Sequence, residues 1–212
     1  MKAELTTSRS YRGLSQEERR ADRRARLIAA AIAVYGERGY HQATVKAVCE
    51  SAGLTERYFY ESFPNSEALL IASFNAVTYA VLGEITRAAK DAGRGRIARS
   101  RAMLHAYFAA LQREPRSARV FLLEIRGVSR AVDLAFDGAL RAIGHEVARI
   151  VAAPGAPDDE LLQAGVVGGV IHIALRWIDD GYAPAIDSVV DTALRLGTVL
   201  SAPQRRTRRA AT

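Results

Sequence analysis

The chain has 212 residues, of which 49% are hydrophobic and 25% are charged. This composition is typical of a folded protein rather than a disordered one, and the length suits one large domain or two small ones. The single cysteine, Cys49, excludes an internal disulfide, and the sequence has no Cys/His cluster from which a zinc site could be built. The first ten residues contain no apolar run, so we expect no secretory signal and a cytoplasmic location.

The formal net charge of +7 is concentrated at the two ends of the chain. The first 26 residues hold eight basic and four acidic side chains, whereas residues 203–212 hold four arginines and no acid. This excess of basic side chains at the two ends suits a polyanionic partner such as DNA. We therefore expect a basic N-terminal arm over residues 1–20 and a basic, disordered tail over residues 203–212. For the tail, a purely solubilising role stays open.

The first predicted element is an amphipathic helix between Arg20 and Arg38, where apolar residues recur at three- and four-residue steps. Gly39 suits the position just after this helix, and Thr44 can cap a second one. The tripeptide Ala52–Leu54 ends the second helix, and Thr55 can cap a third short helix. Two short helices joined at a glycine predict a helix-turn-helix.

The rest of the chain also has helical periodicity. We expect helices over residues 67–91, 97–113, 115–129, 132–153, 158–180 and 186–201, separated by Pro, Gly and Asp. No alternation typical of a strand persists anywhere. The sequence therefore predicts an all-α fold of about nine helices. Its N-terminal helix-turn-helix DNA-binding domain spans residues 21–66, and a larger helical domain spans residues 67–202.

The third predicted helix displays side chains of the types that reach base edges and phosphates in the major groove, namely Thr55, Glu56, Arg57 and Tyr58. Tyr60 is expected to offer its hydroxyl to a phosphate. Phe59 and Phe63, spaced i, i+4, are expected to face inward. For Tyr58 and Tyr60, a role as partly buried surface aromatics without a DNA partner stays open.

Three stretches of this region resemble the TetR family of repressors: Gly39–Val45, Ala52–Thr55 and Tyr60–Leu69. The resemblance covers Leu27–Leu70, and the remainder of the chain matches only in length and helical pattern. It implies a repressor that binds a palindromic operator as a homodimer and is released by a small, often hydrophobic, effector. It also implies that Thr44, Lys46, Thr55, Arg57, Tyr58 and Tyr60 lie at or near double-stranded operator DNA.

One position departs from the family pattern, because Ser66 stands where a lysine is usual. We expect the phosphate contact there to use a hydroxyl or a backbone group. Residues 27–66 hold three basic and four acidic side chains, so the electrostatic attraction to DNA is expected to come from the arginine-rich segment before them. Arg23 and Arg24 of that segment are therefore included among the DNA-binding residues.

The predicted helix over residues 158–180 contains interior glycines, and each lowers the stability of the helix by about 1 kcal/mol relative to alanine. Close approach of another helix would offset this cost, and the last helix has a matching apolar stripe. We expect a four-helix dimer interface that includes Leu161, Gly165, Gly169, Val190, Leu194 and Gly197. A membrane span over Leu161–Ile178 is disfavoured by its length and by its polar residues.

A ligand pocket is expected among the helices between Asn75 and Ile178. Polar and aromatic groups on these mostly apolar helices are the candidates: Tyr79, His105, Tyr107, Phe108, Phe121, Glu124, His172 and Arg176. For each of them an ordinary structural role stays open.

Three alternatives belong to other functional classes. An enzyme would need a nucleophile–base pair, a phosphate-binding glycine loop or a metal cluster, so we expect no catalytic residue, metal or cofactor. A redox switch at Cys49 competes with its interpretation as an inert core thiol one helical turn from Val45. The strongest rival is a ligand-binding or adaptor protein of the same fold without operator recognition, for which Ser66 is the hint. DNA binding distinguishes this rival from a regulator.

Overall fold

The computed structural model describes residues 15–151 and 158–197. This part of the chain forms nine α-helices, a 3₁₀ turn (η1) and a π-helical segment (η2), and it contains no strand. The all-α prediction is therefore confirmed. In chain order the elements are α1 (Gln16–Arg38), η1 (Tyr40–Gln42), α2 (Val45–Ala52), α3 (Glu56–Ser62), α4 (Ser66–Asp91), α5 (Arg96–Arg113), α6 (Pro115–Arg119), η2 (Val120–Glu124), α7 (Arg130–Val151), α8 (Glu160–Asp179) and α9 (Ile186–Gly197).

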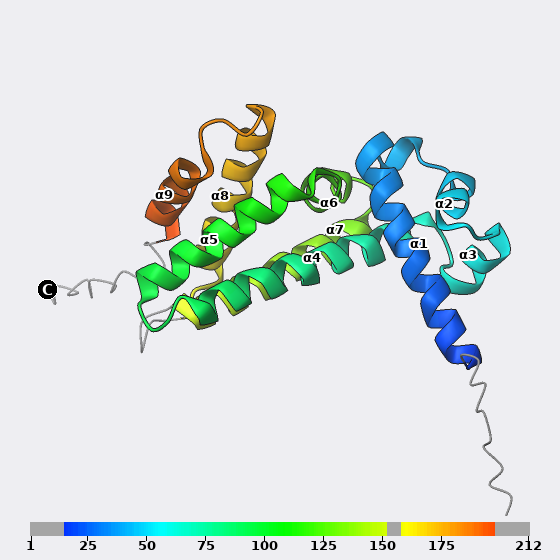
Figure 1. The fold of residues 1–212 in the computed structure, drawn as a ribbon, viewed down its shortest axis with the longest axis horizontal. Coiled ribbons are helices and arrows are strands. Elements are labelled where there is room, and N and C mark those ends of the chain that lie inside the picture. The colour runs from blue at the N-terminus through cyan, green and yellow to red at the C-terminus, as the bar shows by residue number, and fades with distance from the viewer. Residues whose placement is uncertain (1–14, 152–157, 198–212) are drawn as a thin grey trace, which may run out of the picture.

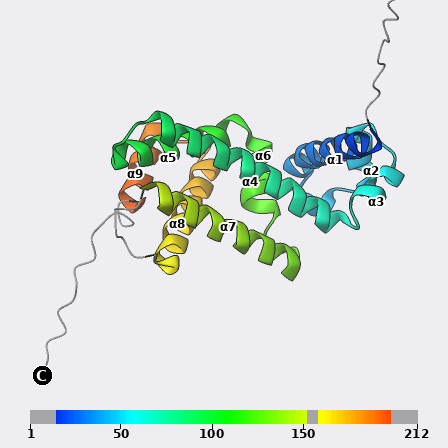
Figure 2. The same cartoon turned by 90° about the horizontal axis from the view of Figure 1, so that it is seen from below.

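The helices form an elongated molecule with two ends of different character. Helices α1, α2 and α3 gather at one end, and α4 runs from them towards the other end, where α5, α8 and α9 lie (Figure 1). Seen from below, α7 runs along α4 and α8 crosses α7 (Figure 2). Helix α4 contacts α5 and α7, while α8 contacts α7 and α9. The long α4 therefore links the small N-terminal unit to the larger helical bundle.

Helix α1 begins earlier than the periodicity predicts. Ser15 and Glu18 form a capping box in which the Ser15 hydroxyl accepts from the Glu18 amide at 3.1 Å and the Glu18 carboxylate accepts from the Ser15 amide at 2.6 Å. This cap satisfies two backbone amides at the start of the helix. The residues of the basic arm from 15 to 20 are thus part of α1 or its cap, whereas residues 1–14 and the tail at 203–212 lie outside the described residues.

The helix expected over residues 115–129 is wrong in its last third, after Glu124. Helix α6 changes into the π-helical η2, the helical structure ends at Glu124, and Gly127 has a left-handed φ of 71° in the following turn. Glu124 is engaged with the N-terminal unit, where it accepts from the Tyr40 amide. This long-range contact has no counterpart in local sequence periodicity. The end of the helix expected over residues 186–201 lies outside the described residues.

Aromatic side chains connect the core of the larger bundle. Phe74 of α4 stacks on Phe121 of η2 at 5.7 Å between ring centroids, and Phe108 of α5 meets Trp177 of α8 edge-on at 5.5 Å. The Trp177 indole donates to the Pro184 carbonyl at 2.7 Å, so its polar group is satisfied. By length and composition alone, α4 and α8 could each cross a membrane, but core helices of soluble proteins share this property. Here the large apolar side chains Phe74 and Trp177 are buried within the bundle.

Candidate nucleic-acid interface and ligand cavity

The N-terminal unit has the local geometry of a helix-turn-helix. Gly39 follows α1 with a φ of 85°, and the Thr44 hydroxyl caps α2 by accepting from the Ala47 amide at 3.1 Å. Gly53 ends α2 in the left-handed region, with φ 62° and ψ 39°, which a side chain would strain. The chain then enters α3. These features agree with the breaks expected from sequence.

Helix α1 fixes the turn between α2 and α3. The Arg26 guanidinium donates to the Ala52 carbonyl at 2.7 Å and to the Gly53 carbonyl at 3.3 Å. These carbonyls lie at the C-terminal end of α2, where a cation also interacts favourably with the helix dipole. Phe59 and Phe63 of α3 are buried, as expected. Arg26 was not predicted to have this role, which depends on the packing of α1 against the turn.

The outer face of α3 carries the exposed side chains of the unit. Arg57 is 84% exposed and pairs with Glu61 of the same helix at 3.0 Å, and Tyr60 is 61% exposed. Thr55 occupies the N-cap position, but its side chain makes no capping hydrogen bond, which differs from the expected cap. Thr55, Glu56, Arg57 and Tyr60 are thus all exposed on one short helix. Such a face can enter a major groove.

Other predicted DNA-binding residues have structural partners. The Arg23 guanidinium lies 4.5 Å from the centre of the half-buried Tyr58 ring, and that of Arg24 lies 4.5 Å from the centre of the Phe63 ring. The Ser66 hydroxyl accepts from the Tyr40 hydroxyl at 3.3 Å. On α2, Lys46 is exposed and lies 4.0 Å from Glu50, and the capping residue Thr44 is also exposed. Because its ring is half-buried beneath Arg23, Tyr58 is less accessible than Tyr60.

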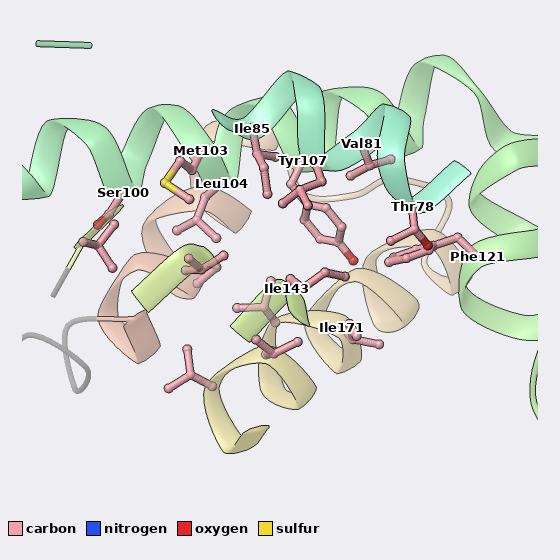
Figure 3. A pocket seen from close by; sticks show the side chains of 17 residues that line it. Thr78, Val81, Ile85, Ser100, Met103, Leu104, Tyr107, Phe121, Ile143 and Ile171 are labelled. Carbon is pink, nitrogen blue, oxygen red and sulfur yellow. The ribbon is translucent and has the colours of Figure 1, made fainter. Parts of the chain in front are cut away.

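The larger bundle contains a partly open apolar cavity of about 110 Å³ (Figure 3). Its walls come from one face each of α4, α5, α7 and α8, with Phe121 of η2 and Ala193 of α9. Most lining side chains are Val, Ile and Leu, and the polar ones are the hydroxyl-bearing Thr78, Ser100 and Tyr107. No charged side chain of the described residues lines it. Such a cavity suits an uncharged, apolar ligand.

Tyr107 carries the one buried polar group in this wall with no hydrogen-bond partner among the described residues. Its side chain is buried, with 9% of the residue exposed, and its hydroxyl oxygen has no partner. Burial raises the pKa of this hydroxyl above its ordinary value of 10.0, so it is a neutral donor at physiological pH. Thr78 differs, because its hydroxyl donates to the Phe74 carbonyl at 2.8 Å.

Of the ligand-binding residues expected from sequence, the structure brings Tyr107 and Phe121 into this cavity. Tyr79, His105, His172 and Arg176 are exposed on the outer faces of their helices, and Arg176 lies 3.7 Å from Asp180. Phe108 is in the core against Trp177, and Glu124 faces η1. Thr78, Ser100, Met103 and the aliphatic lining residues were not predicted from sequence. Their periodicity does not distinguish a cavity wall from solid core.

The predicted dimer residues occupy different surroundings. Leu161 is 88% exposed and Gly165 is exposed on the same face of α8. Val190 is completely buried, and a Cβ added to Gly169 would lie 2.5 Å from the Leu196 side chain of the same chain. Val190 and Gly169 therefore make contacts within one chain. Leu194 is half-buried on α9, and Gly197 is the last residue of that helix.

Cys49 is buried in the N-terminal core. Burial, and to a smaller extent the nearby Glu56 carboxylate, raise the pKa of its thiol. The reactive thiolate form is therefore disfavoured, which supports the interpretation of Cys49 as an inert core thiol.

A polar junction connects η2 with the end of α1. The Glu124 carboxylate accepts from the Tyr40 amide at 2.6 Å and from Arg119 Nε at 2.7 Å. Arg119 also donates to the Glu37 carbonyl at 3.3 Å. Nearby, a Cβ added to Gly36 would lie 2.5 Å from Arg116 Cβ, so α1 and α6 are in close contact. The N-terminal unit is thus held against the element that also contributes Phe121 to the cavity.

Comparison with known proteins gives a family for the N-terminal region. Residues 27–73 match the family described as bacterial regulatory proteins, tetR family. Among curated proteins, none matches the sequence of this chain.

Solved structures extend the likeness to the whole fold. The fatty acid degradation regulator FadR from Bacillus halodurans is 19% identical, with a TM-score of 0.68 over 92% of this chain and 100% of that one. FadR from Bacillus subtilis in complex with stearoyl-CoA is 20% identical, with a TM-score of 0.66 over 85% and 99%. A putative tetR family transcription regulator from Shewanella sp. PV-4 is 15% identical, with a TM-score of 0.69 over 85% and 99%. Residues 27–73 thus match the tetR family at the helix-turn-helix, and the chain shares its fold with these solved regulators.

Proposed function

We propose that the chain is a cytoplasmic repressor that binds a palindromic operator as a homodimer and is released by a small apolar effector. The observation that carries this proposal is that an exposed α3 face lies at one end of the molecule and an apolar cavity lies in the bundle at the other. No catalytic step and no cofactor form part of the proposal. Residues 21–66 act as the DNA-binding domain and residues 67–202 as the effector-binding and dimerisation domain.

Operator recognition is assigned to the outer face of α3. Thr55, Arg57 and Tyr60 reach the major groove, and Glu56 contributes to discrimination among bases. Lys46, with Thr44 at the start of α2, contacts the phosphates. We retain Arg23, Arg24, Tyr58 and Ser66 as residues near the DNA backbone, with Tyr58 positioned beneath Arg23 rather than aimed at bases. Phosphate contacts fix the register of the protein, and base contacts read the sequence.

Dimerisation is assigned to the exposed face of α8. Leu161, Ala164, Gly165 and Gly168 recur there at helical spacing, and all four are exposed. Small residues let another helix approach closely, and an 88% exposed leucine favours burial in an interface. Leu194 and Gly197 of α9 extend this interface. Gly169 and Val190 support it from inside the chain, because they pack α8 and α9 together.

Effector control is assigned to the cavity and to the Glu124 junction. Phe121 lines the cavity, and Glu124, three residues further along η2, holds the Tyr40 amide. A ligand that binds better to one arrangement of η2 shifts the population towards that arrangement. The Bacillus subtilis FadR structure holds stearoyl-CoA, whose acyl chain is apolar, and this supports an effector with an apolar portion. Release from the operator follows if the two α3 helices of the dimer no longer match the spacing of the half-sites.

The test of operator binding is selection from a randomised DNA duplex library by the purified protein. We expect a palindromic motif, which Arg57→Ala and Tyr60→Ala each remove or relax. The matched controls are Arg149→Ala, another exposed arginine paired with a glutamate on its own helix, and Tyr79→Ala, another exposed tyrosine. Both controls should retain the motif. A folded dimeric protein that enriches no motif would instead support the ligand-binding or adaptor function.

A further inference from the structure

The cavity is elongated along α5, with its polar groups at different places. Ser100 and Tyr107 are seven residues apart on this helix, which is roughly 10 Å at the rise of an α-helix. In Figure 3 the Tyr107 ring extends from α5 into the cavity, and its hydroxyl points towards the end where Thr78 and Phe121 are drawn. Ser100 and Met103 lie at the opposite end. Because the Tyr107 hydroxyl is buried and has no partner among the described residues, we expect a ligand to have its polar group at the Tyr107 end.

Among the residues that the structure describes, the Tyr107 end of the cavity has one side-chain hydroxyl that is free to donate a hydrogen bond. The Thr78 hydroxyl hydrogen is committed to the Phe74 carbonyl, whereas the Tyr107 hydroxyl has no partner among the described residues. A buried donor without a partner is unfavourable, so a ligand that accepts its hydrogen bond removes this cost. The remaining wall there, with Phe121 and Ile171, is apolar. The site thus suits one accepting oxygen.

The wall also excludes ionised groups. A carboxylate or an ammonium group placed in the cavity would be buried without a counter-ion, because no charged side chain of the described part of the chain lines it. The cavity volume of about 110 Å³ limits the size of the ligand portion that fits inside. For comparison, an engineered cavity of ~150 Å³ lined by similar residues binds benzene. The ligand portion held there is therefore small.

We infer that the cavity binds a neutral, mainly apolar molecule with one accepting oxygen, such as a ketone or lactone, which receives a hydrogen bond from the Tyr107 hydroxyl. This inference rests on the proposed effector function and specifies its ligand class. The carbonyl would lie between Tyr107, Thr78 and Phe121, with its apolar body extending towards Met103. Binding there would place the ligand directly against η2.

The experiment is calorimetric titration of the full chain with three probes of one shape. Acetophenone carries the carbonyl, α-methylstyrene replaces its oxygen with a methylene group, and benzoate replaces its methyl group with a charged oxygen. We expect acetophenone to bind on the order of 5-fold more tightly than α-methylstyrene, since one hydrogen bond separates them. Benzoate should not bind measurably. A second series with a pentyl group, namely 2-heptanone, 2-methyl-1-heptene and hexanoate, covers a longer shape.

The variant Tyr107→Phe keeps the ring in the wall and removes the hydroxyl. It should lose the preference for the ketone while binding the alkene unchanged, and Tyr79→Phe, which alters an exposed tyrosine outside the cavity, should behave as the wild type. Far-ultraviolet circular dichroism confirms that each variant is folded. The inference is overturned if the carboxylates bind best, if neither ketone binds, or if Tyr107→Phe binds the ketone as tightly as the wild type.

Operator affinity, measured with and without the ketone, separates this inference from the proposed function. Loss of operator binding in the presence of the ketone supports both. Tyr107-dependent ketone binding that leaves operator affinity unchanged supports the ligand class and contradicts the effector role. Benzoate that binds in the cavity and releases the operator supports the effector role and overturns the ligand class.

Discussion

Replacing Glu124 with alanine tests whether the junction between η2 and α1 stabilises the fold. The carboxylate is 11% exposed and accepts from the Tyr40 amide at 2.6 Å, a bond to a charged acceptor worth about 1.5–3 kcal/mol. Its pairing with Arg119 is worth less, about 1 kcal/mol or below, because the arginine is 41% exposed. We expect Glu124→Ala to lower the free energy of unfolding by about 3 kcal/mol in total.

Thermal unfolding followed by circular dichroism measures this loss. For a chain of this length, 3 kcal/mol corresponds to a fall in Tm of roughly 6–12 °C. Glu124→Gln retains an acceptor for the Tyr40 amide and should lose less. Glu84→Ala is the matched control, because Glu84 pairs with Arg113 at 2.7 Å but is 34% exposed, and it should cost about 1 kcal/mol or less. If Glu124→Ala melted within about 2 °C of the wild type, the junction would not stabilise the fold as argued.

The remaining predictions concern close packing, pH and salt. Gly36→Ala should destabilise the protein by about 1–3 kcal/mol in denaturant unfolding, because the added Cβ meets the Arg116 backbone. Gly83→Ala on α4, where nothing lies within 4 Å of an added Cβ, should stabilise the protein by up to about 1 kcal/mol. Equal effects of the two substitutions would refute the close contact at Gly36. Burial raises the pKa of Tyr35 and Tyr107, so above about pH 10 the unfolded state releases protons that the folded state keeps. Stability should then fall with rising pH by up to about 1.4 kcal/mol per unit for each tyrosine, and Tyr107→Phe should reduce that slope in urea titrations between pH 9 and 11. Removing residues 1–14, which leaves the α1 capping box intact, should lower the salt dependence of operator binding by about 0.9 log unit for each phosphate that the arm neutralises; an unchanged dependence would mean that the arm does not touch DNA.

The helix-turn-helix could be predicted from sequence because its boundaries depend on local chemistry. Gly39 and Gly53 adopt positive φ, and Thr44 caps α2 with its own hydroxyl. The end of helical structure at Glu124 could not be predicted in this way. It coincides with a hydrogen bond to a residue 84 positions earlier, and no periodicity encodes that partner.

The cavity was only partly predictable because the bundle helices are apolar on most of their surface. Tyr79, His105 and His172 are each adjacent in sequence to a residue that lines the cavity, namely Thr78, Leu104 and Ile171. Successive residues in an α-helix point about 100° apart, so one position separates the wall from the outer surface. The sequence supplies the polar candidates, and only the packing of four helices decides which of them face inward.

Tyr40 connects the cavity walls to the N-terminal unit through two hydrogen bonds. Its amide is held by Glu124 of η2, the segment that contributes Phe121 to the cavity, and its hydroxyl donates to Ser66 at the start of α4, the helix that contributes Thr78. A ligand that changes the separation of Thr78 and Phe121 would therefore act on one residue from two elements. Because Tyr40 closely follows the end of α1, and α1 holds the α2–α3 turn through Arg26, a small displacement at Tyr40 would reorient α3 as a rigid unit rather than unfold it. This arrangement would let an effector change the spacing of the reading helices in a dimer without disturbing the cores on either side.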